Sequence, residues 1–288
     1  MNELTGKTIL ITGATNGIGK VAALDLAKQG ATIVLVGRNP AKVADTVREI
    51  KEQSGNPLVD GLVADLFSLA EVRRLANEFR KKYPQLHVLV NNAGAIFTDR
   101  QHTIDGYERT FALNHLAYFL LTNLLLDMLK ANAPARIVNV SSGAHQGAAL
   151  DFDDLQNEQH YGAGGMRAYG QSKLDNLLFT YELARRLAGS GVTVNALHPG
   201  VVATGFGENN SGGIRFGMKL FHLFSLTPQQ GADTIVYLAS SPDVEGVTGK
   251  YWEKRKQIAS SPASYDEATQ KRLWEVSAQM TGLTEAVR

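Results

Sequence analysis

Short apolar runs rich in β-branched residues alternate along this chain with longer stretches in which apolar residues recur at helical spacing. The apolar runs occupy residues 7–12, 31–37, 57–65, 86–92, 135–142 and 192–198. Strands that are continuously apolar and separated by helices indicate a parallel sheet covered by helices on both faces. The chain has 288 residues and no Pro/Ser-rich linker, so the pattern predicts a single α/β domain.

The most hydrophobic long run, residues 111–129, is interrupted by polar side chains at Asn114, His115, Asn123 and Asp127. A helix that spans a membrane needs about 20 predominantly apolar residues. We therefore expect a helix buried in the core. The initiator methionine is followed almost directly by the first predicted strand, so we also expect no targeting segment, no stable membrane anchor and a cytoplasmic protein.

Two irregular segments interrupt the alternation, at residues 145–165 and 207–225. Both follow predicted strands, and open α/β sheets bind their ligands beyond the carboxyl ends of the strands. These segments are therefore expected to shape a substrate pocket.

Charge and composition exclude several classes of function. The chain carries 29 Lys and Arg residues against 28 Asp and Glu residues, so a net charge of +1 favours neither nucleic acid nor an anionic membrane. There is no cysteine, which excludes disulfides, a thiol nucleophile and cysteine-ligated zinc. The seven histidines show no metal-binding spacing, so we expect no metal site.

A glycine-rich turn gives the first sign of a cofactor. In ILITGATNGIGKVAALDLA, Gly13, Gly17 and Gly19 lie between the first strand and the helix that follows it. Glycines at this position let the backbone turn tightly and approach a pyrophosphate at the positive end of a helix. The spacing differs from the general dinucleotide fingerprint, and the alternative is a purely structural turn. We favour the nucleotide site because the strand, turn and helix occur in the required order.

The end of the second strand bears on which nucleotide binds. An acidic residue there usually contacts the ribose 2′-hydroxyl of NAD, whereas an arginine can pair with the 2′-phosphate of NADP. Here the strand ends in Gly37, Arg38 and Asn39. The sequence therefore favours NADP(H), the alternative being that Arg38 is simply exposed.

Tyr169 and Lys173 lie one helical turn apart in RAYGQSKLDNLLF, so their side chains share one side of the predicted helix. A nearby ammonium favours phenolate over phenol and lowers the pKa of the tyrosine. A phenol tuned in this way can exchange protons near neutral pH. The alternative is a half-buried tyrosine beside a solvated lysine.

Several motifs occur together in order: TGATNGIG, NNAG at residues 91–94, the serine pair of IVNVSS, YGQSK and the HPG of ALHPGVVATG. With these motifs the sequence resembles a classical short-chain dehydrogenase/reductase. The segment before YGQSK and the C-terminal RLWEVSAQMTGL are similar to the retinol dehydrogenase-like branch. The resemblance implies a Rossmann-type, doubly wound parallel sheet of about seven strands.

The resemblance also implies roles for individual residues. Tyr169 would be the catalytic acid/base, and Lys173 would lower its pKa and bind the nicotinamide ribose. Ser142 would hold the substrate oxygen, with Ser141 the lesser candidate. Asn114 would support a water through which Lys173 is reprotonated.

Other positions would bind the cofactor in relatives of this kind. Asp65 resembles the residue that contacts adenine, and Pro199 begins the loop that closes over the nicotinamide. The full set comprises Gly13, Thr15, Asn16, Gly17, Ile18, Gly19, Arg38, Asp65, Leu66, Asn92, Ala93, Gly94, Tyr169, Lys173, Pro199, Gly200, Val202 and Thr204. Tyr161 is not a catalytic candidate, because Gly165 stands where the lysine would be, and His198 is expected to be structural.

The expected activity is therefore that of an NADP(H)-dependent oxidoreductase that interconverts an aldehyde or ketone and its alcohol. The alternative is a non-catalytic NADP(H)-binding regulatory or scaffold protein, and a homo-oligomer is compatible with either. Residues 205–227 could form a substrate lid, since Phe216, Leu220, Leu223 and Phe224 recur at helical spacing. Such a lid would favour lipophilic substrates; the alternatives are a fixed surface helix and an interfacial membrane helix.

Overall fold

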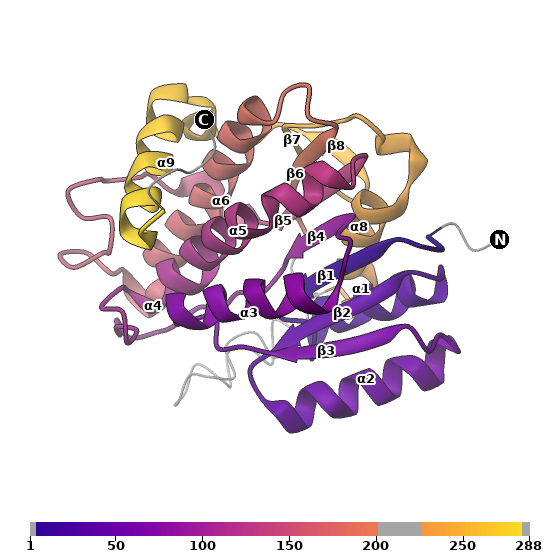
Figure 1. The fold of residues 1–288 in the computed structure, drawn as a ribbon. Helices are drawn as coiled ribbons and strands as arrows, with labels where there is room; N and C mark the ends of the chain where they lie inside the picture. The colour runs from indigo at the N-terminus through magenta and orange to yellow at the C-terminus, as the bar shows by residue number, and fades with distance from the viewer. Residues whose placement is uncertain (1–3, 201–225, 284–288) are drawn as a thin grey trace.

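A computed structural model describes residues 4–200 and 226–283 of the chain (Figure 1). Its centre is one twisted sheet in the strand order β3-β2-β1-β4-β5-β6-β7-β8. The strands are β1 Thr8–Thr12, β2 Thr32–Gly37, β3 Val59–Val63, β4 Val88–Asn91, β5 Ala135–Val140, β6 Val192–His198, β7 Lys250–Glu253 and β8 Lys256–Ile258. The first seven strands pair in parallel, and β8 runs antiparallel to β7. The predicted doubly wound fold is confirmed, with β8 as an additional short edge strand.

Helices cover both faces of the sheet, as Figure 1 shows. The longer helices are α1 Gly17–Lys28, α2 Pro40–Ser54, α3 Leu69–Lys82, α5 Ala117–Ala131, α6 Met166–Arg186, α8 Pro228–Ser240 and α9 Glu267–Thr281. One face packs against α1, α2 and α8, and the other packs against α3, α5 and α6. The C-terminal helix α9 lies on α6 and α5, where Trp274 enters the core. The sheet is therefore buried on both sides, as its continuously apolar strands require.

The apolar run at residues 111–129 is a core helix. Within the described residues, the helical stretch Arg109–Ala131 is the one long and apolar enough to cross a membrane, and 78% of its apolar window is buried inside the protein. It comprises α4 Arg109–Phe111, the π turn η1 Ala112–Leu116 and α5. Its burial in the core accounts for this hydrophobicity.

Amide side chains join the central strands to the helices above them. Asn91 Nδ2 donates to Asn139 Oδ1 and to Thr122 Oγ1, both at 2.9 Å. Asn139 Nδ2 donates in turn to Thr180 Oγ1 at 2.9 Å. All four side chains are buried, so these bonds satisfy polar groups that would otherwise be costly inside the core. They fix β4 and β5 against α5 and α6, which carry much of the candidate site.

Strand β1 lies at the topological switch point of the sheet. It pairs with β2 on one side and with β4 on the other, so the chain winds outward in opposite directions from this strand. The crevice beyond the carboxyl ends of β1 and β4 is where sheets of this type bind nucleotides. The glycine turn and the NNAG motif both follow these strand ends.

Candidate active site

Helix α6 carries Tyr169 and Lys173 to the carboxyl end of β5. Lys173 is 3% exposed, and its Nζ donates to the carbonyl of Val140, the last residue of β5, at 3.0 Å. The same Nζ lies 5.6 Å from the ring centroid of Tyr169 and 5.9 Å from that of Tyr118. The lysine is therefore buried between two tyrosine rings. Tyr118 was not identified from the sequence, although it follows Asn114 by one helical turn.

The two serines after β5 have different contacts. Ser141 Oγ donates to the carbonyl of Lys173 at 2.7 Å, which ties the strand to α6 beside the lysine. Ser142 is the N-cap of the short helix η2 Gly143–Gly147, and its Oγ accepts from Ala144 N at 3.2 Å. The Ser142 hydroxyl also hydrogen-bonds the Tyr169 phenol. The geometry thus separates a serine that anchors the helix from a serine that faces Tyr169.

Asn114 occupies the centre of the π turn η1, a backbone form frequent at functional sites. Its Oδ1 accepts from Ala95 N at 2.9 Å, while its Nδ2 donates to Ala95 O at 3.0 Å and to Ser172 Oγ at 2.9 Å. A Cβ added at Gly94 would lie 3.2 Å from Asn114 Oδ1 and 3.3 Å from Lys173 Nζ. Gly94 therefore leaves a space that both side chains border.

Burial shifts the pKa values of Tyr169 and Lys173 in directions that the sequence did not predict. Burial raises the pKa of Tyr169 to about 12, although the hydrogen bond with Ser142 acts in the opposite direction. Burial lowers the pKa of Lys173 to about 7. The predicted lowering of the tyrosine pKa is therefore wrong for the protein alone. A buried lysine loses its own charge readily, and its Nζ is directed at the Val140 carbonyl.

The glycine turn brings backbone against backbone. Gly13 has φ +65°, and a Cβ there would lie 2.7 Å from Ala93 Cα. A Cβ at Gly19 would lie 2.4 Å from Asn92 Nδ2 and 2.7 Å from Gly13 O. Thr12 fixes the facing segment, since its Oγ1 accepts from Asn92 N at 2.9 Å and from Ala93 N at 3.0 Å. Glycine is therefore required by space as well as by backbone conformation.

The N-terminus of α1 has the features of an anion site. Helices α2 and α3 are capped by the side chains of Asn39 and Ser68, whereas Asn16 makes no side-chain cap to α1 in the described structure. The first turn of α1 also contains no acidic residue. Its backbone N–H groups and helix dipole therefore suit a pyrophosphate, and the residues fit the dinucleotide that the sequence predicts.

Arg38 is exposed at the end of β2, with its guanidinium carbon 5.7 Å from the ring centroid of Phe67. Phe67 in turn packs edge to face on Phe97 at 5.7 Å, and Arg109 lies 4.7 Å from the Phe67 ring. Asp65 Oδ1 accepts from Phe67 N at 3.2 Å. The ends of β2 and β3 thus combine a cation, a ring and a carboxylate. Phe67 carried no signal in the sequence, because an aromatic residue after a strand is usually read as core.

The remaining predicted cofactor positions divide between two parts of the chain. Thr15 and Ile18 lie in the glycine turn and the start of α1, Leu66 follows β3, and Pro199 and Gly200 follow β6. Val202, Thr204 and nearly all of the predicted lid lie outside the described residues. Tyr161, which is not a catalytic candidate by its spacing, has a hydroxyl that donates to Phe97 O at 2.9 Å.

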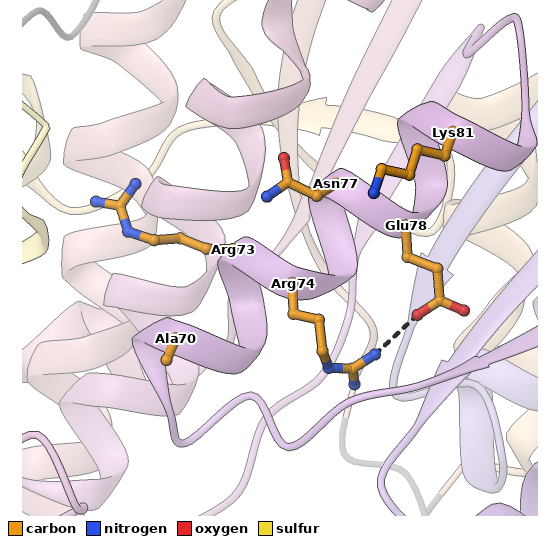
Figure 2. A pocket seen from close by; sticks show the side chains of 6 residues that line it. All are labelled: Ala70, Arg73, Arg74, Asn77, Glu78 and Lys81. Atoms are coloured by element: carbon orange, nitrogen blue, oxygen red, sulfur yellow. Dashed lines mark hydrogen bonds and ion pairs between the residues drawn. The ribbon is translucent and has the colours of Figure 1, made fainter.

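A surface hollow elsewhere on the molecule is not part of this site. Figure 2 shows its lining on the outer face of α3, where Arg74 pairs with Glu78 at 2.8 Å. Its other lining residues are Ala70, Arg73, Asn77 and Lys81. No residue predicted for catalysis or cofactor binding lies there. In the described ranges, His, Asp and Glu side chains form no group of three suited to a metal ion.

Comparison with known proteins places this geometry in context. The sequence model of the short chain dehydrogenase family matches residues 7–152. Human retinol dehydrogenase 13 is 44% identical over 97% of this chain and 86% of its own length. A crystal structure of an uncharacterised protein from Mycobacterium paratuberculosis has a TM-score of 0.78 and 32% identity, covering 96% of this chain and 94% of its own. The RhlG/NADP active-site complex of Pseudomonas aeruginosa has a TM-score of 0.70 and 26% identity, covering 86% of this chain and 94% of its own.

Proposed function

The chain belongs to the short chain dehydrogenase family, and from this premise we propose that it is an NADP(H)-dependent enzyme interconverting a lipophilic aldehyde or ketone and its alcohol. The family and the retinol dehydrogenase relatives make it an oxidoreductase of alcohol or carbonyl groups. We propose three points beyond this family assignment: a preference for NADP(H), a lipophilic substrate and the roles of individual residues.

One observation carries the catalytic part of the proposal. The Ser142 hydroxyl and the Tyr169 phenol are hydrogen-bonded to each other at the end of β5, and Lys173 is buried beside the tyrosine. Two hydroxyls this close to each other could both donate to one substrate oxygen on which negative charge develops. A binding protein without chemistry would have no need for this pair.

The residues around the switch point would hold the cofactor. The N–H groups at the start of α1 and the glycine turn would bind the pyrophosphate, and Arg38 would pair with the 2′-phosphate. Lys173 would bind the nicotinamide ribose. When bound, NADP(H) supplies the hydride in reduction and accepts it in oxidation.

The direction of the Tyr169 pKa shift suits the role of proton donor in reduction. A phenol with a pKa raised to about 12 keeps its proton at neutral pH. In reduction, Tyr169 donates this proton to the substrate oxygen while Ser142 stabilises the developing charge by a hydrogen bond. In oxidation the proton must return to a phenolate, which burial disfavours. A cationic Lys173 would help that step, and its pKa of about 7 lets it gain or lose a proton near neutrality.

Two observations support the finer parts of the proposal. NADP(H) is supported by the exposed Arg38 at the end of β2, and the Pseudomonas aeruginosa neighbour is an NADP complex. A lipophilic substrate is supported by the human relative, because retinol is an apolar alcohol.

The test is an oxidation assay of NADPH and of NADH against aldehydes and ketones of increasing chain length. We expect turnover to be faster with NADPH than with NADH, and faster with the longer apolar carbonyls than with short ones. Tight NADPH binding without turnover of any carbonyl would instead support the regulatory or scaffold alternative.

A further inference from the structure

The backbone at Ser142 and Gly143 leaves the sheet and is held by two imidazoles. Ser141 N still donates to Leu197 O of β6 at 2.8 Å, which is the last bond of the ladder on this side. Beyond it, His145 Nδ1 lies 2.6 Å from the carbonyl oxygen of Ser142. Gly143 N donates to His198 Nδ1 at 3.1 Å. One histidine thus bonds the carbonyl of Ser142 and another bonds the next N–H.

The partners of His145 fix its tautomer. Ser261 N donates to His145 Nε2 at 3.1 Å, so Nε2 must carry a lone pair. The proton of the neutral ring is then on Nδ1, which donates to Ser142 O. The side chain is fully buried, and its ring packs edge to face on Tyr251 of β7 at 5.0 Å between centroids. His145 is therefore a neutral, oriented bridge between Ser142 and Ser261.

His198 is constrained in a corresponding way. Its Nδ1 accepts from Gly143, and a Cβ added at Gly143 would lie only 3.3 Å from its Nε2. The ring and the turn are therefore in close contact. Glu253 and Lys254 face His198 from the neighbouring β7 segment, and His145 and His198 would repel each other if both were charged.

We propose that His145 and His198 are positioning residues that together set the direction of the Ser142 hydroxyl toward the substrate oxygen. This inference rests on the proposed function, in which Ser142 binds that oxygen. Ser142 has an extended backbone, with φ −160° and ψ 156°, and the direction of its Cα–Cβ bond follows from the orientation of its two flanking peptide groups. The two imidazoles hold both ends of the peptide group that follows Ser142. His145 bonds its C=O, and His198 bonds its N–H.

The bridge also reaches the C-terminal part of the fold. Ser261 belongs to a buried segment in which Tyr181 OH and Ser260 Oγ lie 2.6 Å apart and Ser260 Oγ and Ser264 Oγ lie 2.6 Å apart. His145 therefore couples the catalytic turn to the segment that packs on α6. A change at Tyr181 perturbs this segment without touching Ser142, so it provides a structural control.

Two substitutions at His145 separate its two bonds. An asparagine amide can stand in for Nδ1, so H145N keeps the donor to Ser142 O and loses the acceptor for Ser261. A glutamine amide can stand in for Nε2, so H145Q keeps the bond to Ser261 and loses the one to Ser142. The measurements are kcat and KM of the full chain with NADPH and an accepted carbonyl, normalised to the fraction of protein that binds NADPH.

Misplacement of a reacting group by about 1 Å can cost about 10²-fold in rate. We expect H145Q to lose about that much in kcat with KM for NADPH nearly unchanged, and H145N to recover most of the loss. The control Y181F should lower the melting temperature while keeping kcat. Wild-type kcat in H145Q, or equal losses in H145N and H145Q, would overturn the inference.

Two further variants keep the outcome interpretable. If H145Q does not fold, the same comparison is made at His198, where H198N keeps an acceptor for Gly143 N and H198Q does not; equal kcat in that pair would overturn the inference. The variant S142A tests the proposed function itself. Full activity in S142A would refute the role of Ser142, whereas loss in S142A with normal H145Q would refute only the role of the histidines.

Discussion

At the scale of single residues, the proposed chemistry depends on groups whose charge states the sequence could not give. The spacing of Tyr169 and Lys173 predicted that they share one side of a helix, and they do. Their pKa shifts depend on how deeply both are buried and on where Lys173 Nζ is directed. The burial and the direction of Nζ both result from the packing of α6 on β5, and a local sequence motif carries no information about that packing.

Removal of the Tyr169 hydroxyl should abolish most of the turnover. A positioned general acid typically contributes about 10²- to 10⁴-fold, so Tyr169→Phe is expected to lower kcat by that factor. NADPH affinity, measured by its fluorescence on binding, should change little. Tyr161→Phe is the matched control, because that hydroxyl bonds Phe97 O outside the proposed site. A Tyr169→Phe enzyme with wild-type kcat would refute the assigned role.

Arg38 should determine the choice between the two nicotinamide cofactors. Hydrogen bonds to charged groups contribute about 1.5 to 3 kcal/mol, which corresponds to about 10- to 100-fold in affinity. Arg38→Ala is therefore expected to raise KM for NADPH by that factor and to leave KM for NADH nearly unchanged.

Phe67→Leu removes the ring that lies near the guanidinium, and we expect a smaller rise of about 2- to 5-fold for NADPH alone. Arg48→Gln is the control, since Arg48 is an exposed arginine that pairs with Asp45 on α2. Equal effects of Arg38→Ala on both cofactors would contradict a contact with the 2′-phosphate.

At the scale of elements, the start of α1 and the turn after β5 are shaped by close backbone contacts. The sequence predicted the glycine turn from its spacing, but not which glycine is most constrained. A Cβ at Gly19 would meet both Asn92, in the segment after β4, and the Gly13 carbonyl, in the turn after β1, and the contact with Asn92 joins parts of the chain that are far apart in sequence.

Gly19→Ala should impair cofactor binding more than the small size of the added methyl group suggests. Its Cβ would lie 2.4 Å from Asn92 Nδ2, so either α1 or the segment after β4 must shift. We expect a loss of stability of about 1 to 3 kcal/mol, together with a clear fall in NADPH affinity measured by titration. Gly147→Ala is the control, because nothing lies within 4 Å of the added Cβ. Normal NADPH affinity in Gly19→Ala would contradict a tight approach at this turn.

The two histidines beside Ser142 make stability depend on pH in a defined sense. Burial lowers the pKa of His145 and of His198 below the ordinary value of 6.5. A group whose pKa is lowered by folding stabilises the protein fully above its unfolded pKa, and the stabilisation is lost as the pH falls. The free energy of unfolding should therefore decrease as the pH is lowered from 6.5, as measured by urea denaturation. The decrease should be smaller in H145N; an identical pH dependence would show that His145 is not involved.

The elements themselves show what sequence patterns can and cannot predict. The six apolar strands were found because most of their residues are apolar, and the central strands β1, β2 and β4 are almost wholly buried. β7 and β8 were missed, because KYWE and KQI are short and mix apolar residues with charged or polar ones. β7 pairs with β6, which lies far earlier in the sequence, and β8 pairs with β7 at the edge of the sheet.

At the scale of the whole molecule, the switch point at β1 gathers residues from strand ends that are far apart in the chain. The order of motifs predicted this fold, and the observed strand order confirms it. The two-sided helical cover could also be predicted. The hydrogen bonds that link Ser142 through His145 to Ser261 could not be predicted, because His145 and Ser261 are 116 residues apart and the bonds involve backbone groups that have no sequence signature.

Cofactor binding should stabilise the entire domain. A ligand present at 100 times its Kd adds about 2.7 kcal/mol to the free energy of unfolding, which corresponds to about 5 to 10 °C in melting temperature for a domain of this size. We expect this shift with NADPH and a smaller one with NADH at the same concentration, measured by calorimetry. In Arg38→Ala the two shifts should become similar. A larger shift with NADH in the wild type would contradict the proposed preference.

The most direct test of hydride transfer is the fate of a deuterium label. The enzyme is incubated with NADPH deuterated at C4 of the nicotinamide and a long-chain aldehyde, and the alcohol is analysed by mass spectrometry. We predict that the wild-type enzyme produces an alcohol with the label on its carbinol carbon, and that Tyr169→Phe produces almost no alcohol. NADPH binding with no labelled alcohol from any carbonyl tested would contradict it.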